Sequence, residues 1–117
     1  MPVLSHVGRV ALLAVFAVPA TLVPLQAVLA AAPAKVQKVA IDNFAFAPQV
    51  IVVAPGTTVT WTNADEDPHT VTATDKSFHS AAMDTNESYS FTFARPGEYA
   101  YFCSLHPHMT GKVIVKG

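Results

Sequence analysis

The sequence predicts an all-β fold, an antiparallel Greek-key β-sandwich of about seven to eight short strands that follows an apolar N-terminal segment. Two observations support the sandwich. After residue 34, apolar and polar residues alternate over short runs with the period of a half-buried strand, and no window has the period of a helix. The Pro-Gly pairs at 55–56 and 96–97 separate these runs as turns, because proline presets φ and glycine accepts a positive φ.

Local composition assigns the individual runs to strands. Residues 50–53 are β-branched throughout, which is typical of a buried strand. In residues 58–63, Val59 and Trp61 alternate with threonines, so both are expected to face the core. Residues 75–86 have no clear period and are interpreted as a connection between the two sheets. The expected strands are residues 35–41, 50–53, 58–63, 70–74, 88–93, 98–102 and 112–116.

The N-terminal segment differs from the rest of the chain, and we interpret residues 1–32 as a secretory signal peptide. Residues 10–34 carry no charge and consist of an apolar core followed by small residues. This order predicts cleavage between residues 30 and 34. Residues 33–117 then form a single domain, which we expect to be exported to the periplasm.

An uncleaved membrane anchor is the alternative, because about 20 apolar residues are enough to span a bilayer. Pro19 and Pro24 interrupt the apolar run, and small residues follow it. Both features favour cleavage, so we expect no membrane span in the mature protein.

The mature region is small and nearly neutral. Removing Arg9 leaves six of the seven Lys and Arg residues against eight Asp and Glu residues, so the chain has no basic patch of the kind that binds nucleic acid. A domain of this size is only marginally stable without a cross-link. Its single cysteine cannot form an internal disulfide, the usual cross-link of exported proteins. A bound metal would occupy the thiolate and connect loops.

The only cysteine lies in a segment rich in potential metal ligands. Cys103 is followed by His106 after three residues and by Met109 after six, and His69 lies upstream. Two imidazoles and a thiolate form the trigonal plane of a mononuclear electron-transfer copper site, and a thioether is its weak axial ligand. We expect Cys103, His106 and Met109 to share one loop between two strands, stiffened by Pro107.

Other interpretations of these residues are weaker. Taken alone, a cysteine in a β protein is usually a small buried hydrophobe, and a methionine usually fills the core. Zinc has little use for a thioether ligand. A Cys-His nucleophile would need an oxyanion stabiliser, and the sequence shows none. A copper enzyme would need further ligand sets, so we predict that the chain is not an enzyme.

Several segments together resemble the cupredoxins, the type 1 blue copper proteins, and in particular their amicyanin-like members within the plastocyanin and pseudoazurin branch. The resemblance implies one copper ion that alternates between Cu(II) and Cu(I). It implies that His69, Cys103 and His106 are equatorial ligands, that Met109 is axial, and that the protein is a periplasmic one-electron carrier. The matching segments are residues 56–63, 68–69, 90–93, 96–103 and 106–113.

The chain departs from this family at two positions near the site. Thr70 stands where the family usually has an asparagine that ties the copper loops together, and a hydroxyl is shorter and offers fewer hydrogen bonds. His108 stands where a bulky aromatic is usual, and it is interpreted as an exposed loop residue or as a residue that changes partner docking or adds pH sensitivity near the site. Pro68 and Pro107 are expected to line an apolar docking patch around His106.

The partners are expected to be redox proteins, namely a dehydrogenase, a cytochrome c or a reductase, and the carrier is expected to be a monomer. Acidic residues 65–67 are candidates for steering a basic partner, although such loops are usually only solvated. The rival hypothesis is a periplasmic protein for copper trafficking or storage. The small number of Met and His residues in the mature chain favours electron transfer, and a sandwich with a purely structural role is the third possibility.

Overall fold

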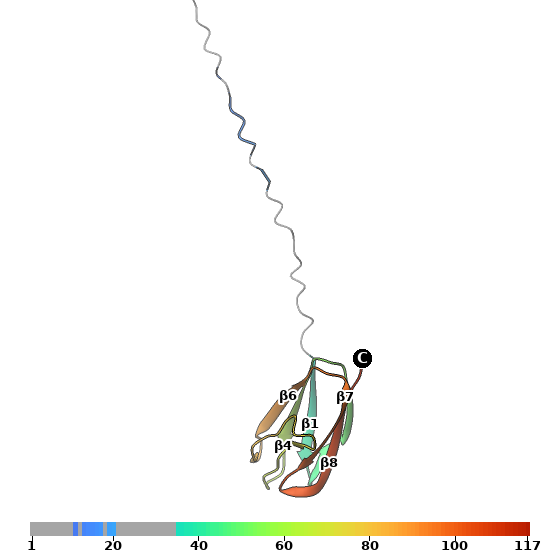
Figure 1. Cartoon of the computed structure of the whole chain (residues 1–117). Coiled ribbons are helices and arrows are strands. Elements are labelled where there is room, and N and C mark those ends of the chain that lie inside the picture. Colours follow the sequence, from blue (N-terminus) through green and yellow to red (C-terminus); the bar gives the residue numbers. More distant parts are fainter. Residues whose placement is uncertain (1–10, 12, 18, 21–34) are drawn as a thin grey trace, which may run out of the picture. The chain divides into compact units, whose positions relative to one another are not determined.

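The computed structural model describes residues 11, 13–17, 19–20 and 35–117 (Figure 1). Most of the predicted signal peptide, with its cleavage region, lies outside these residues. Within the described part of the chain, no helix has the length and hydropathy needed to cross a membrane.

Residues 35–117 form an all-β sandwich, as predicted from the alternating pattern (Figure 1). One sheet has the order β2-β1-β4-β6 and the other has the order β3-β8-β7-β5. The strands are β1 (Val36–Asp42), β2 (Ala45–Ala47), β3 (Val50–Val53), β4 (Thr57–Asn63), β5 (Thr72–Ala73), β6 (Ser88–Phe93), β7 (Gly97–Cys103) and β8 (His106–Val115).

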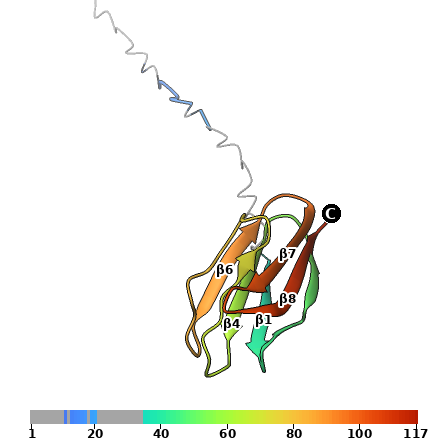
Figure 2. The same ribbon diagram turned by 60° about the horizontal axis from the view of Figure 1, so that its bottom comes forward.

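The sandwich is not purely antiparallel, which corrects one part of the prediction. β1 pairs in parallel with β4, and β3 pairs in parallel with β8. The reason is topological: between β1 and β4 the chain crosses to the other sheet as β3, and it then returns in its original direction. β1 and β4 therefore both finish at the same end of the sandwich as β7, whose last residue is Cys103, and Figure 2 shows these strands.

The long loop expected between residues 102 and 112 is largely strand, so this prediction was wrong. β7 continues to Cys103, and β8 begins at His106 after a two-residue turn. Cys103 pairs with His106, and the register shifts between Phe102 and Cys103. Backbone pairing in this hairpin therefore extends to the predicted ligands Cys103 and His106. A bulge accommodates the residues of β8 that have no partner on β7.

The expected strand at residues 70–74 is reduced to β5 because its first amides have other partners. The Thr70 N–H donates to Cys103 Sγ, and the Val71 N–H donates to Ser80 Oγ. Neither group is available to a sheet ladder, so pairing with β7 begins only at Thr72.

A row of hydroxyl pairs fixes the register of β4 against β6. On the outward face, three threonines of β4 lie 2.7–2.8 Å from hydroxyls of β6. The inward residues of the same strand are buried, including Trp61 and Asn63 with 0% exposure. Strict alternation therefore places Asn63, the last residue of β4, beneath the loop that leads to His69. The hydroxyl pairs are Thr58–Thr92, Thr60–Ser90 and Thr62–Ser88.

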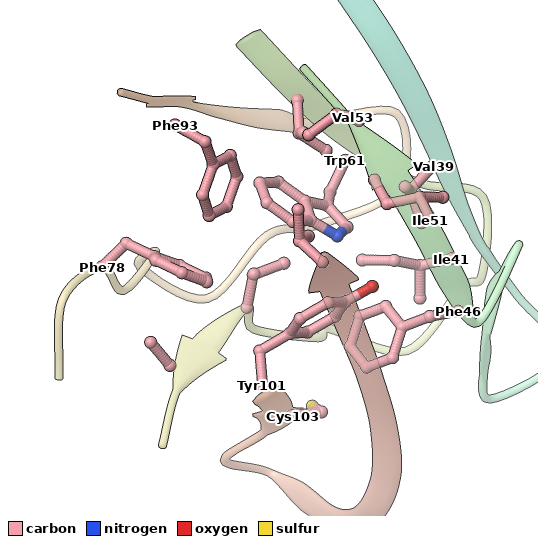
Figure 3. Close-up of a cluster of buried hydrophobic side chains, with 14 of the residues drawn as sticks. Val39, Ile41, Phe46, Ile51, Val53, Trp61, Phe78, Phe93, Tyr101 and Cys103 are labelled. Atoms are coloured by element: carbon pink, nitrogen blue, oxygen red, sulfur yellow. The ribbon is translucent and has the colours of Figure 1, made fainter. Parts of the chain in front are cut away.

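Aromatic rings fill the core and extend it to Cys103 (Figure 3). Trp61 contacts Tyr101 edge-on at a centroid distance of 5.4 Å, and Phe46 contacts Tyr101 at 4.8 Å. Burial raises the pKa of the Tyr101 phenol. Gly111 lies opposite Tyr101 on β8, where an added Cβ would collide with the tyrosine ring. The packed ring in turn fixes β7 two residues before the thiol.

Candidate metal centre

Three of the four predicted ligands converge at one end of the sandwich. The donor atoms of His69, Cys103 and His106 all lie within 4.8 Å of one another. Cys103 Sγ is 3.7 Å from Nδ1 of each histidine. Met109 is 3% exposed and follows His106 by three residues on β8, at the same end of the molecule.

The spacing of these donors fits a first-row metal ion. Metal bonds of about 2.0–2.1 Å to nitrogen and about 2.3 Å to sulfur, opened to a trigonal angle, separate the two donors by about 3.7–3.8 Å. The nitrogen–sulfur separations of 3.7 Å agree with this value. Because the fourth candidate donor is a soft thioether, the set suits copper better than zinc.

His69 is held in place by its backbone as well as by its ring. Its N–H donates to the carbonyl of Met83, and its carbonyl accepts from the N–H of Met83. Asn63 donates from Nδ2 to the carbonyls of Asp67 and Met83, at 2.9 Å each. The loop before His69 is therefore anchored to the end of β4, and Asn63 is a site residue whose role the sequence interpretation missed.

Asp65 orients the ring of His69. Its Oδ2 lies 2.8 Å from His69 Nε2, which leaves Nδ1 directed toward Cys103 Sγ. Partial burial raises the pKa of Asp65, but N–H donors from Phe44 and Asn43, together with His69, outweigh burial and lower it below the ordinary value. Asp65 is thus a structural anion with its side chain only 12% exposed, not a freely solvated member of an acidic loop.

Thr70 ties the two ligand-bearing segments together despite its short side chain. Its N–H donates to Cys103 Sγ at 3.3 Å. Its hydroxyl oxygen accepts from the Ser104 N–H at 2.7 Å and lies 2.8 Å from Ser104 Oγ and 3.1 Å from Thr72 Oγ1. The expected loss of hydrogen bonds is therefore offset, because Ser104 and Thr72 bring their own hydroxyl groups.

The remaining predicted residues lie at the surface around the ligands. Pro68, Pro107 and His108 are exposed, whereas His106 is half-buried. Phe44 was not predicted as a site residue, yet its ring lies edge-on to both His69 and His106. The sequence gives a weak signal for it, an Asn-Phe pair between two short apolar runs that proves to be a hairpin turn.

Comparison with known proteins assigns the family. The family described as Cupredoxin-like domain matches residues 9–115. This chain is a cupredoxin. Amicyanin-alpha of Methylorubrum extorquens is 36% identical over 90 residues, which cover 73% of this chain and 76% of the relative. The cupredoxin is thus of the amicyanin-like type.

Solved structures agree with this assignment. A point variant of amicyanin in its Cu(I) form has a TM-score of 0.66 and 31% identity, covering 69% of this chain and 82% of that one. A Cu-containing nitrite reductase from Thermus scotoductus has a TM-score of 0.65 and 31% identity, covering 68% of this cupredoxin and 22% of the enzyme chain. These relatives support a blue copper electron-transfer protein, built on a fold that also occurs within an enzyme.

Replacing Thr70 tests the hydroxyl connection. We expect Thr70→Val to lower the free energy of unfolding of the metal-free protein by about 1–3 kcal/mol, because the partly buried Ser104 N–H loses its acceptor. Thr70→Ser keeps the oxygen and is expected to recover most of that loss. The measurement is urea denaturation. Thr92→Val is the matched control, since it removes one hydroxyl from an exposed threonine pair. Equal effects of the two valine variants would show that Thr70 has no special role.

Proposed function

We propose that this cupredoxin is a periplasmic one-electron carrier and not an enzyme. His69, Cys103, His106 and Met109 would hold one copper ion through two imidazoles, a thiolate and a thioether. The bound copper supplies the redox chemistry by alternating between Cu(II) and Cu(I). The convergence of the three donor atoms within 4.8 Å is the observation that carries this proposal.

The anchoring of the ligands supports electron transfer. Three sets of contacts hold the donor residues in place without a metal. They are the Asp65 contact to His69 Nε2, the paired backbone bonds between His69 and Met83, and the bond from the Thr70 N–H to Cys103 Sγ. Ligands held in this way can move little between the two copper charge states. Copper trafficking is less favoured, because His69 and Cys103 are fully buried and Met109 nearly so, which slows metal exchange.

Electrons would cross at His106. Of the three converging donors, only this histidine is not fully buried. Phe44 and Leu105 expose 41% and 48% of their surface near it, and Pro107 is exposed beside it. We define Phe44, Leu105, Pro107 and Pro68 as the apolar rim, a surface suited to transient contact with another redox protein.

Carboxylates are frequent in the chain segments next to Phe44 and Pro68 of the apolar rim and in the segment before β6. The Asn63 N–H donates to the carbonyl of Glu87, and Thr85 Oγ1 donates to the carbonyl of Asp65, so the segment before β6 lies against the loop after β4. No Lys or Arg occurs in residues 39–75, 84–94 or 99–111. The charge complement is therefore a basic partner such as a cytochrome c. The carboxylates at this end belong to Asp42, Asp65, Glu66, Asp67, Asp84 and Glu87.

Copper binding is tested by adding Cu(II) to the metal-free protein of residues 31–117. We expect intense blue absorption and a narrow copper hyperfine splitting in the EPR spectrum, because the thiolate shares the unpaired electron. Cys103→Ser is expected to lose both features while remaining folded. A pale wild-type spectrum typical of tetragonal copper would mean that Cys103 is not a ligand and would overturn the electron-carrier proposal.

Steering is tested by the rate of electron exchange with a lysine-rich cytochrome c. We expect the second-order rate constant to fall at least about tenfold between low and high ionic strength. The Glu66→Gln and Asp67→Asn double variant should weaken that dependence, whereas Asp75→Asn, on the connection after β5, should not. A rate independent of salt would argue against a basic partner.

Export is tested by N-terminal sequencing of the protein recovered from periplasmic extract. We expect the mature chain to begin between residues 31 and 34, as the predicted leader implies. Recovery of a chain that begins at Met1 in the membrane fraction would favour the anchor.

A further inference from the structure

Phe44 occupies a backbone conformation that is unusual for an aromatic residue. Asn43 and Phe44 have φ values of 52° and 56° and form the two-residue turn between β1 and β2, where Asp42 pairs with Ala45. Such turns favour Asn-Gly, because both central residues need a positive φ. A bulky residue in the left-handed region is an outlier, and such outliers cluster where the surroundings impose them for function.

The Asp65 carboxylate stabilises this turn through hydrogen bonds to its two central residues. Oδ1 accepts from the Asn43 N–H at 2.7 Å, and Oδ2 accepts from the Phe44 N–H at 2.9 Å. The same Oδ2 lies 2.8 Å from His69 Nε2. One carboxylate therefore connects a turn more than twenty residues upstream to a ligand imidazole.

The result is a phenyl ring placed against both imidazoles. Phe44 meets His69 at a centroid distance of 5.2 Å and 88°, and it meets His106 at 5.1 Å and 87°. The two imidazoles are 4.9 Å apart. Within residues 35–117, no other aromatic side chain contacts either histidine ring. The contact is perpendicular to both rings, a geometry that aromatic pairs prefer.

We propose that Phe44 is a positioning residue for the copper centre, held by Asp65 in a left-handed turn so that its ring limits rotation of the His106 imidazole. This inference rests on the proposed electron-carrier function, because the two histidines need to be held in place only if they bind copper. His106 needs such a contact more than His69 does. Asp65 and full burial already fix His69, whereas His106 is half-buried and stands at the exposed start of β8.

Glycine substitutions separate the ring from the turn. Phe44→Gly removes the ring and supplies the residue that the turn prefers, so the hairpin should fold at least as well. Asn43→Gly relaxes the same turn and keeps the ring, and it is the matched control. Phe44→Tyr keeps an aromatic ring and should restore the wild-type behaviour. Phe44→Leu keeps the apolar volume without the ring, and it serves if the glycine variant does not fold.

Two measurements report on the position of the ring. In the metal-free protein, NMR relaxation of the His106 side chain should show added motion in Phe44→Gly, with His69 much less affected. In the copper-loaded protein, release of Cu(II) to a chelator should be about 10–100-fold faster in Phe44→Gly, the usual effect of removing a group that orients a metal ligand. Asn43→Gly and Phe44→Tyr should match the wild type in both.

Two results would overturn this inference. Unchanged His106 motion and copper release in both Phe44→Gly and Phe44→Leu would reduce Phe44 to a surface residue of the apolar rim. Equal changes in Phe44→Gly and Asn43→Gly would assign the effect to the turn backbone and not to the ring. The wild-type copper spectrum separates these outcomes from failure of the proposed function. If the wild-type protein is blue and the Phe44 variants behave like it, the electron-carrier proposal stands and only the role of Phe44 is lost.

Discussion

The site depends on one partly buried carboxylate. Asp65 accepts from two consecutive backbone N–H groups and contacts the far nitrogen of His69. A carboxylate with this many partners is stable as an anion, and it can therefore orient an imidazole without a metal present. Asn63 supports the arrangement from below, since its Oδ1 accepts from the Asp65 N–H at 2.9 Å. The end of β4, the β1–β2 turn and the candidate ligand His69 are thus one hydrogen-bonded unit.

The β7–β8 hairpin supplies the other half of the site, and here backbone pairing positions the residues. Cys103 and His106 are paired residues of one ladder, so backbone pairing sets their separation. Tyr101 packs between Trp61 and the space left by Gly111, which fixes the approach of β7 to the site. Thr70 then joins the two halves, because it touches Cys103 Sγ with its N–H and Ser104 with its hydroxyl. The backbone N–H of residue 104 supplies the main contact to the Thr70 hydroxyl, and the Ser104 hydroxyl adds a second one at 2.8 Å.

Local sequence was enough to predict the parts of this fold that depend on period and donor chemistry. The runs 58–63 and 88–93 alternate with period two, and the Cys-x-x-His-x-x-Met spacing carries its own chemistry. The missed features depend on partners far along the chain. β2 is three residues long and pairs with β1 across a turn that Asp65 stabilises from more than twenty residues away. No local pattern marks Asp65 as partly buried or Phe44 as a neighbour of both histidines.

The distribution of exposure fits the proposed electron route through His106. His69 and Cys103 have 0% exposure, and Met109 has 3%, so water reaches little of the donor set. His106 is the exception, and it lies between an exposed phenyl ring and an exposed proline. Exposure of one imidazole edge would shorten the proposed path to a partner, but it also removes the packing that would otherwise fix that imidazole. A side chain that covers His106 without burying it resolves this conflict, and Phe44 is in the position to do so, because Asp65 holds its backbone while its ring stays at the surface.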